Sequence, residues 1–538
     1  MGAICLIGFL LRLAVFNQSG YGDEMSTLWI VKGNDLAGII PAVNSDAEIS
    51  PPFFFLLAKL ATVFGQSVAA IRLPSLIAGM VSLPVIYLLA LKTLGRRAAF
   101  YALAVASISP FLVSYSGNAR GYALMILMVL LSALALVAAT SENGRWWHWC
   151  GYSVAAALTV YSHYVGALAI AGQVLWVLVC FPSSRLKVIG WSLVAALLFA
   201  PWLGGFRADL DSPTTEILQF LQGTGFRVKV EGVSQMLFTH LSQEPAPVFW
   251  DRPDILLGCV ALLFACVGVF SQLGRGALQG PWSRRSSGVL LAVFMVFTPI
   301  VGELVLLAFG TDIFGTRNLA PVWAGLPLLY AAVCVAAGRR WGLVAMTFLL
   351  AALLYGSVRI ADPEKSTIDY RSAAEQIEKH ETPGGAVLDA SIISPAPQTP
   401  LDAYLDTEMT VVRPRAYKDE PDFIHDIFRN FNPQRFVNSA FSNPGPVNVV
   451  TVKHSQEPHL TEGPGGRRYR FQLATPYNVN ATVTIPRGWV EIERTSFPGL
   501  LPITVTRFKR TDRNPAASRS TNGKPAEQEA SKGGGNGN

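Results

Sequence analysis

Long apolar segments recur through the first two thirds of the chain, and they constrain its fold more than any other feature. A helix needs about 20 apolar residues to cross a bilayer. Segments of roughly that length fill the chain from residue 1 to about residue 360, and they predict about eleven transmembrane helices. The expected spans are 3–16, 71–91, 98–115, 119–139, 149–162, 163–181, 187–206, 253–271, 288–309, 318–337 and 341–358. The fifth and sixth spans abut, so they could also form one long helix.

The composition fits a membrane protein. Hydrophobic residues make up 51% of the 538 residues and charged residues 15%, with a mean hydropathy of +0.37. A soluble domain usually carries about 25% charged residues. These values argue against a soluble cytosolic enzyme and against a disordered protein. The net charge of +7 then reflects basic loops beside a membrane, and we expect no nucleic-acid partner.

Lysine and arginine are distributed unevenly among the loops, which predicts the orientation. Every second connection is basic and nearly free of acids, namely 91–97, 141–148, 181–187, 271–285 and 338–341. The first outer loop (17–70), the second large outer loop (202–252) and residues 309–317 carry the acids. Cytoplasmic loops are enriched in basic residues. We therefore expect a multi-pass protein of the cytoplasmic (inner) membrane, with a cytoplasmic N-terminus and a periplasmic or extracellular C-terminal domain.

The sequence changes character after residue 360. Segment 367–380 has helical spacing and ends at a glycine-containing stop signal. The segments "GAVLDAS", 447–454, 468–474, 480–486 and 501–510 alternate or are rich in β-formers. Residues 361–510 therefore predict a small extracytoplasmic α+β domain, and residues 511–538 a disordered tail.

Acidic residues in the first outer loop are candidates for chemistry. Asp23 and Glu24, in "GYGDEMSTLW", fall just beyond the first span. A carboxylate pair at a membrane boundary can act as a base or bind a metal or sugar hydroxyls. The alternative is a solvated pair that merely ends a helix. Glu48 precedes two helix-breaking prolines and a short apolar run, which by itself favours a structural interfacial helix.

Cationic and aromatic residues lie at the same outer boundary. Arg120 and Arg317 each stand at the outer start of an expected span, where an arginine needs a phosphate or carboxylate partner unless it only snorkels. Two such arginines facing an acidic pair predict a site for an anionic substrate, such as a phosphate on a lipid carrier. His163 could carry a proton or bind a metal, although a lone histidine is more often structural. Tyr164 fits an interfacial aromatic belt equally well.

The order of these motifs resembles that of GT-C-type glycosyltransferases. The matching segments are Arg12 with "DEMST", "EISPPFFF", the "RLPS" at 72–75, "NARGYAL", the pair His163–Tyr164, "TRNLAPVWAGLP" and "DYRSAAEQI" at 369–377. The nearest families are the bacterial lipopolysaccharide galacturonosyltransferases, the lipid A aminoarabinose transferases and the protein O-mannosyltransferases. Three positions depart from the family pattern: Ser50 replaces a histidine, Asn118 an acid and Asn318 a tyrosine. The likeness covers residues 1 to about 410.

The resemblance implies a GT-C fold over residues 1–360 and a polyprenyl-phosphate sugar donor. Asp23, assisted by Glu24, would deprotonate the acceptor hydroxyl, and the sugar would be transferred with inversion. Arg120, Arg317, Arg72 and His163 would meet the donor phosphate. The cavity and the acceptor would be contacted by Glu48, Tyr122 and Tyr164. Some relatives use a divalent metal ion, and Asp23, Glu48 and His163 could supply its ligands here, so the metal is left open.

Other functions stay open at this point. A lipid-linked-sugar flippase or transporter would also place charges on helices near the membrane, although it often shows repeated halves. A surface-polysaccharide polymerase or ligase would use the same class of donor. A non-catalytic scaffold would need neither Asp23 nor Arg120. The acceptor of a transferase could be a glycolipid, a polysaccharide or a protein.

Overall fold

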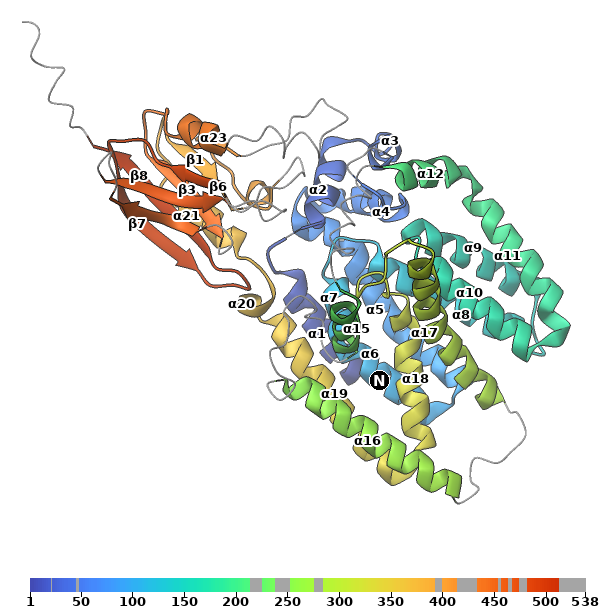
Figure 1. The fold of residues 1–538 in the computed structure, drawn as a ribbon. Coiled ribbons are helices and arrows are strands. Elements are labelled where there is room, and N and C mark those ends of the chain that lie inside the picture. Colours follow the sequence, from blue (N-terminus) through green and yellow to red (C-terminus); the bar gives the residue numbers. More distant parts are fainter. Residues whose placement is uncertain are drawn as a thin grey trace, which may run out of the picture.

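The structure is a computed structural model of the whole chain. It describes residues 1–20, 22–44, 48–212, 225–237, 252–274, 284–391, 399–413, 433–452, 456–462, 467–473 and 481–511. The described part consists of a large helical body and a smaller sheet domain (residues 363–511) joined to it through α19 and α20 (Figure 1). Residues 512–538, in which a disordered tail is expected, lie outside the described residues.

The helical body begins with α1 (Gly2–Phe16), and the short helices α2, α3 and α4 follow before the first long helix. The bounds are α2 (Glu24–Gly33), α3 (Ile39–Val43), α4 (Phe53–Ala61), α5 (Val68–Thr93), α6 (Arg96–Ile108), α7 (Pro110–Ser116), α8 (Tyr122–Ala139), α9 (Trp146–Ser162), α10 (Gly166–Cys180), α11 (Arg185–Phe199), α12 (Leu203–Asp211), α15 (Phe226–Met236), α16 (Pro253–Gly274), α17 (Arg284–Ala308), α18 (Val322–Ala336), α19 (Arg339–Ala361) and α20 (Pro363–Ser366). Segments 149–162 and 163–181 form two helices, α9 and α10, rather than one.

The protein is a multi-pass membrane protein. Within the described residues, six helical segments are long and apolar enough to cross a bilayer, and a seventh span results if the bent pair α6–α7 counts as one. The expected number of about eleven is not confirmed. The helices α1, α10 and α18 are apolar but have 15 residues each. At about 1.5 Å per residue they reach roughly 22 Å, less than the hydrocarbon core of about 30 Å.

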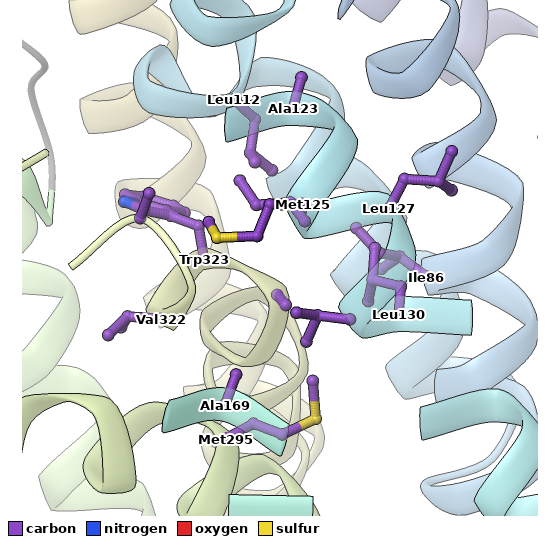
Figure 2. Packing of buried hydrophobic residues seen from close by; sticks show 14 of the residues in the cluster. Ile86, Leu112, Ala123, Met125, Leu127, Leu130, Ala169, Met295, Val322 and Trp323 are labelled. Atoms are coloured by element: carbon purple, nitrogen blue, oxygen red, sulfur yellow. The ribbon is translucent and has the colours of Figure 1, made fainter. Parts of the chain in front are cut away.

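One continuous hydrophobic core holds the helical body together. Helix α5 packs along α6 and α8, while α17 packs between α10 and α18. Figure 2 shows the centre of this core, where Met125 of α8 and Trp323 of α18 lie close together and Met295 of α17 lies near Ala169 of α10. The long helices therefore form a fixed frame beneath the loops that carry the polar residues.

The break between α6 and α7 is satisfied by buried polar side chains. Pro110 begins α7, and the two helices meet at an angle of 57°. The carbonyls at the end of α6 lose their helical donors, and such groups need other partners when they are buried. Arg12 of α1 donates to the carbonyls of Ser107 (3.0 Å) and Ala106 (3.1 Å), and Ser357 of α19 donates to that of Ile108 (2.7 Å). Arg12 is thus a buried cap of a broken helix.

The sheet domain contains two sheets. Its strands are β1 (Ala386–Asp389), β2 (Thr410–Val412), β3 (Val447–Val452), β4 (Gln456–Thr461), β5 (Arg468–Leu473), β6 (Ala481–Thr484), β7 (Trp489–Phe497) and β8 (Ile503–Arg510). Five form a sheet in the order β2-β1-β3-β8-β7, and three form a sheet in the order β4-β5-β6. Strand β1 is parallel to β2 and β3, with Ala386 opposite Thr410 and Val447, whereas β8 runs antiparallel to β3 and β7.

Two helices cover opposite faces of the larger sheet, because its central strands are apolar on both sides. Leu388 and Val449 pack with α23 (Pro433–Ala440) in one cluster. Val387 and Val450 pack with α21 (Tyr370–Lys379) in the other. The expected helix and the five expected strands are present, which confirms a C-terminal region of mixed helix and sheet. Strands β2, β4 and β7 were not expected.

Candidate active site

Glu24 and Arg72 form a buried ion pair beneath the first outer loop. Glu24 begins α2, and both of its oxygens accept from the Arg72 guanidinium, at 2.7 Å and 2.6 Å. The backbone N–H of Ala119 also donates to Glu24, at 2.8 Å. The other N–H groups of Arg72 donate to the carbonyls of Phe16, Gln18 and Ser19. All five donors of Arg72 are thus occupied, so the geometry favours a structural role for this pair.

Asp23 precedes this pair at the N-terminus of α2, and its carboxylate points to a different environment. It forms an ion pair with Arg317 from the loop before α18, and the two side chains are 48% and 46% exposed. Burial alone would raise the pKa of Asp23, but attraction to Arg317 and Arg120 outweighs it and lowers the pKa below its usual value. Asp23 is therefore an accessible carboxylate held ionised by two cations.

Arg120 is fixed beside Asp23 by a second carboxylate. Its guanidinium donates to both oxygens of Glu48, at 2.5 Å and 2.9 Å, and to Ser50 Oγ at 2.9 Å. It also lies 3.5 Å from the backbone carbonyl of Asp23 and over the ring of Phe55. The Arg120 and Glu48 side chains are only 11% and 4% exposed. This bidentate pair is rigid, in contrast to the open pair of Asp23 and Arg317.

A glycine brings His163 close to this cluster. Gly121 precedes α8, and a Cβ atom there would lie 2.3 Å from the carbonyl of Ser162, so only glycine allows this approach. The His163 ring packs against that of Tyr122 at a tilt of 33°, with the ring centroids 4.8 Å apart. Burial, and then repulsion from Arg120 and Arg317, lowers the pKa of His163 to about 3. His163 is neutral at physiological pH and can meet a phosphate only through an N–H group.

Tyr164 belongs to a neighbouring group of side chains. Its hydroxyl donates to Asp209 of α12, and the indole Nε1 of Trp202 donates to Tyr164 at 2.9 Å. Its ring packs edge-on against Phe199 and Phe206. No hydrogen bond among the described residues links Tyr164 to Asp23 or Arg120. The structure thus gathers Asp23, Arg120, Arg317, His163 and Tyr122, with Glu48 holding Arg120, and leaves Tyr164 to one side.

Sequence reasoning missed a buried acid that supports the Arg317 loop. Glu303 of α17 is fully buried, and one of its oxygens accepts from the backbone N–H of Gly315 at 3.4 Å. Its other oxygen has no hydrogen-bond partner among the described residues. Glu303 is the only charged residue in the apolar run 286–308. An acid within such a run is a signal for a functional or structural role that the sequence alone could have provided.

Helix α15 also contacts the loop that carries Arg317. Lys229 Nζ lies 2.5 Å from both oxygens of Asp312, and this pair is largely buried. The ring of Phe226 stacks on that of Phe314. Contacts of α15 and Glu303 therefore border the loop from which Arg317 reaches Asp23.

The candidate metal ligands do not fit a divalent ion in this arrangement. Both oxygens of Glu48 bind the Arg120 guanidinium, and Asp23 binds that of Arg317. Across the described residues, no group of three or more His, Cys, Asp and Glu side chains could hold a metal ion. A cation beside each carboxylate opposes a second positive charge at the same place. The guanidinium groups thus occupy the positions at which a metal ion would meet Asp23 and Glu48.

Comparison with solved structures gives matches of low identity and low TM-score. Solved structures with a similar course include ArnT from Cupriavidus metallidurans, with 14% identity, 84% of this chain and 92% of that chain covered, and a TM-score of 0.42. The oligosaccharyltransferase AglB from Archaeoglobus fulgidus has 12% identity, coverage of 90% and 75%, and a TM-score of 0.45. The arabinofuranosyltransferase AftD from Mycobacteria has 15% identity, coverage of 95% and 40%, and a TM-score of 0.42.

Sequence comparison gives a family match over part of the chain. No curated protein matches significantly. Residues 49–204 match the family model described as dolichyl-phosphate-mannose-protein mannosyltransferase. That segment begins one residue after Glu48 and contains the rest of the "EISPPFFF" motif together with the "RLPS", "NARGYAL" and His163–Tyr164 motifs. The match confirms that this multi-pass membrane protein resembles the GT-C-type glycosyltransferases that use polyprenyl-phosphate sugar donors.

Proposed function

We propose that the protein is a glycosyltransferase that moves one monosaccharide from a polyprenyl-phosphate carrier to a hydroxyl group of a glycolipid, polysaccharide or protein. The observation that carries this proposal is the half-exposed Asp23 carboxylate flanked by Arg317 and Arg120. A carboxylate base can deprotonate an acceptor hydroxyl, and two cations beside it can bind a phosphate. The family match over residues 49–204 supports the donor class.

The reaction would be a single displacement. Asp23 takes the proton of the acceptor hydroxyl, and the oxygen forms a bond to the anomeric carbon of the sugar. The bond from that carbon to the phosphate oxygen breaks, and its electron pair leaves with the polyprenyl phosphate. The sugar is transferred with inversion, and Asp23 then releases the proton to water. Arg120 and Arg317 would stabilise the charge on the leaving phosphate. A phosphate leaves easily, so the neutral His163 need not protonate it.

The two arginines would have different tasks. Arg120 is fixed by Glu48 and Ser50, so it offers a preorganised charge. Arg317 is half exposed and bound only to Asp23 among the described carboxylates, so a donor phosphate can compete for it. When Arg317 turns to the phosphate, Asp23 loses the cation that most lowers its pKa. Donor binding would thereby make Asp23 a stronger base at the moment when an acceptor must be deprotonated.

Glu24 and Arg72 would act through position rather than contact with the substrate. Their ion pair ties α2, α5 and residue 119 together directly below Asp23. We therefore propose that Arg72 does not bind the donor phosphate and that Glu24 keeps the α2 terminus in place. Tyr122 lines the site beside His163, while Tyr164 lies to one side with Asp209 and Trp202, where an acceptor could pass.

We further propose that the reaction takes place on the outer face of the cytoplasmic membrane. The basic loops between residues 91 and 341 support a cytoplasmic location for the opposite ends of the helices. The sheet domain contacts the first outer loop, because the Tyr404 hydroxyl accepts from the backbone N–H of Gly20. Asp23 and the sheet domain therefore share one face. Eleven spans would fit this orientation if the shorter helices α1, α9, α10 and α18 also cross.

The proposal can be tested with the full chain in nanodiscs. A panel of polyprenyl-phosphate sugars is incubated with the protein and candidate acceptors, and loss of sugar is followed by mass spectrometry. We expect one donor to turn over, and Asp23→Asn to slow turnover by about 10²–10⁴-fold. Asp362→Asn changes a partly exposed acid that pairs with Lys365 on α20; it is the matched control and should be unaffected. No turnover of any donor by the wild type would favour a flippase or a scaffold instead.

A further inference from the structure

The start of the first outer loop is held between the helical body and the sheet domain. From below, Arg72 donates to the carbonyls of Gln18 (2.5 Å) and Ser19 (3.3 Å). From the other side, Thr367 Oγ1 donates to the Ser19 carbonyl at 3.1 Å. The backbone N–H of Gly20 donates to the Tyr404 hydroxyl at 2.5 Å. The two parts of the chain therefore fix the same stretch of backbone, three residues before Asp23.

The Tyr404 side chain packs against both the helical body and the sheet domain. Its ring packs against the hydrophobic core of the helical body and also against the cluster that α21 forms with the sheet. The guanidinium of Arg371, at the start of α21, lies 5.4 Å from the centre of this ring. Burial raises the pKa of the Tyr404 phenol, which keeps the hydroxyl neutral. A neutral phenol can accept from Gly20 without adding charge beside Glu24 and Arg72.

We propose that Tyr404 is a positioning residue, through which the sheet domain fixes the backbone that leads to Asp23. This inference rests on the proposed function, because it assigns Tyr404 to the base of that reaction. Tyr404 does not touch Asp23, and it lies 384 residues from Gly20 in the sequence. Its effect on catalysis would come from the direction in which the loop leaves Gly20 towards α2.

The geometry makes this loop sensitive to the loss of one contact. Arg72 holds the carbonyls up to Ser19, but among the described residues the backbone N–H of Gly20 has Tyr404 as its hydrogen-bond partner. Displacement of a catalytic group by about 1 Å can cost about 10²-fold in rate. A loop that is freed at Gly20 would still be tethered at Ser19 and at Glu24, so a smaller loss is expected.

Tyr404→Phe tests the proposal because it removes the hydroxyl and keeps the ring between the two clusters. We expect kcat to fall about fivefold, as for the loss of one hydrogen bond, with the donor KM unchanged. The matched control is Tyr469→Phe, which makes the same change in the same domain. The Tyr469 ring packs on Phe508, away from the first outer loop. Tyr469→Phe should leave both parameters as in the wild type.

Hydrogen exchange of the peptide covering residues 16–24 provides a readout that does not depend on activity. We expect the Gly20 amide to exchange faster in Tyr404→Phe than in the wild type or in Tyr469→Phe. Unchanged exchange would overturn the contact itself. Faster exchange with unchanged kcat would overturn the positioning role. Absence of turnover in all three proteins would refute the proposed function and, with it, this role, while the exchange data would still decide whether the contact exists.

Discussion

Arg72 donates two hydrogen bonds, of 2.7 Å and 2.6 Å, to the carboxylate of Glu24, and both side chains are almost completely buried. The adjacent residue, Asp23, instead faces an open ion pair. Two consecutive acids therefore have separate tasks, which follow from their surroundings and not from their chemistry. The buried Glu24 carboxylate bonds within the protein, whereas the half-exposed Asp23 carboxylate can contact a substrate.

Removing one partner of the buried pair should destabilise the protein. Arg72→Met leaves Glu24 buried without its cation, and such a loss typically costs about 3–5 kcal/mol. We expect a clearly lower unfolding temperature in detergent, measured by nanoscale fluorimetry. Arg359→Met, near the end of α19, is the control for loss of a basic residue in a helix. A normal unfolding temperature in Arg72→Met would contradict the structural role assigned to this pair.

Arg317 should control the pH dependence of the reaction through Asp23. The pKa of Asp23 is lowered in the free protein, so the carboxylate stays ionised as the pH falls to its usual pKa and below. Arg317→Ala removes the strongest favourable charge, and the folded-state pKa of Asp23 rises. We expect the acidic limb of the profile of kcat/KM against pH to move to higher pH and the donor KM to rise.

Arg317→Lys should show a smaller shift than Arg317→Ala, because it keeps the charge and loses the planar fork. His163 should add no further titration between pH 5 and pH 8, since its pKa is lowered to about 3. An acidic limb at the same pH in Arg317→Ala and in the wild type would show that Arg317 does not act on the catalytic base.

Turnover should not require a divalent metal ion. Arg120 covers both oxygens of Glu48, and Arg317 covers Asp23, so positive charge is already supplied to the site. We expect turnover in an excess of EDTA to stay within about twofold of the untreated rate, as for a site whose cations are side chains. Loss of activity with EDTA that Mg²⁺ or Mn²⁺ restores would show that a metal displaces one of these arginines.

Glu303 should matter through the loop that it holds. Glu303→Gln keeps an oxygen that can accept from Gly315, so we expect near-normal kinetics. Glu303→Leu removes the acceptor and leaves the partly buried N–H group of Gly315 unpaired, at a cost of at most about 1–3 kcal/mol. We expect Glu303→Leu to raise the donor KM, because the Arg317 loop loses its support. Equal KM values for both variants would indicate that Gly315 does not depend on Glu303.

The sequence allowed the helical class, the mixed C-terminal region and the loop positions of the site residues to be predicted. Long apolar runs give a local signal. Arg120 and Arg317 are visible because arginine is disfavoured at the outer ends of such runs, and Asp23 is visible because it forms an acidic pair just beyond the first run. The partners of these residues were not predictable. Arg72 and Arg120 both stand at the start of an expected span. The guanidinium of Arg72 makes all its hydrogen bonds to a buried acid and backbone carbonyls, whereas that of Arg120 borders an open cluster.

The remaining differences also have physical causes. The expected number of spans is not confirmed, because apolar composition does not reveal where a helix ends, and α1, α10 and α18 end after 15 residues. Strand β7 was missed because Val490 and Ile492 alternate with Glu491 and Glu493, and the two apolar side chains are the exposed ones, the reverse of the usual pattern. The role of Tyr404 could not be predicted from the sequence, because its contact with Gly20 joins segments 384 residues apart.

The buried cap that Arg12 provides has a consequence for biogenesis. Helix α1 is synthesised long before α6, whose carbonyls accept from Arg12. An arginine disfavours the membrane insertion of a helix by about 2.5–3.5 kcal/mol at the helix centre, and by less at Arg12, one turn from the end of α1. Isolated α1 should therefore integrate poorly during translation and wait at the translocon until α6 and α7 emerge. In a translation-coupled insertion assay, Arg12→Leu should let α1 integrate by itself, and efficient integration of the wild-type helix alone would contradict this order of assembly.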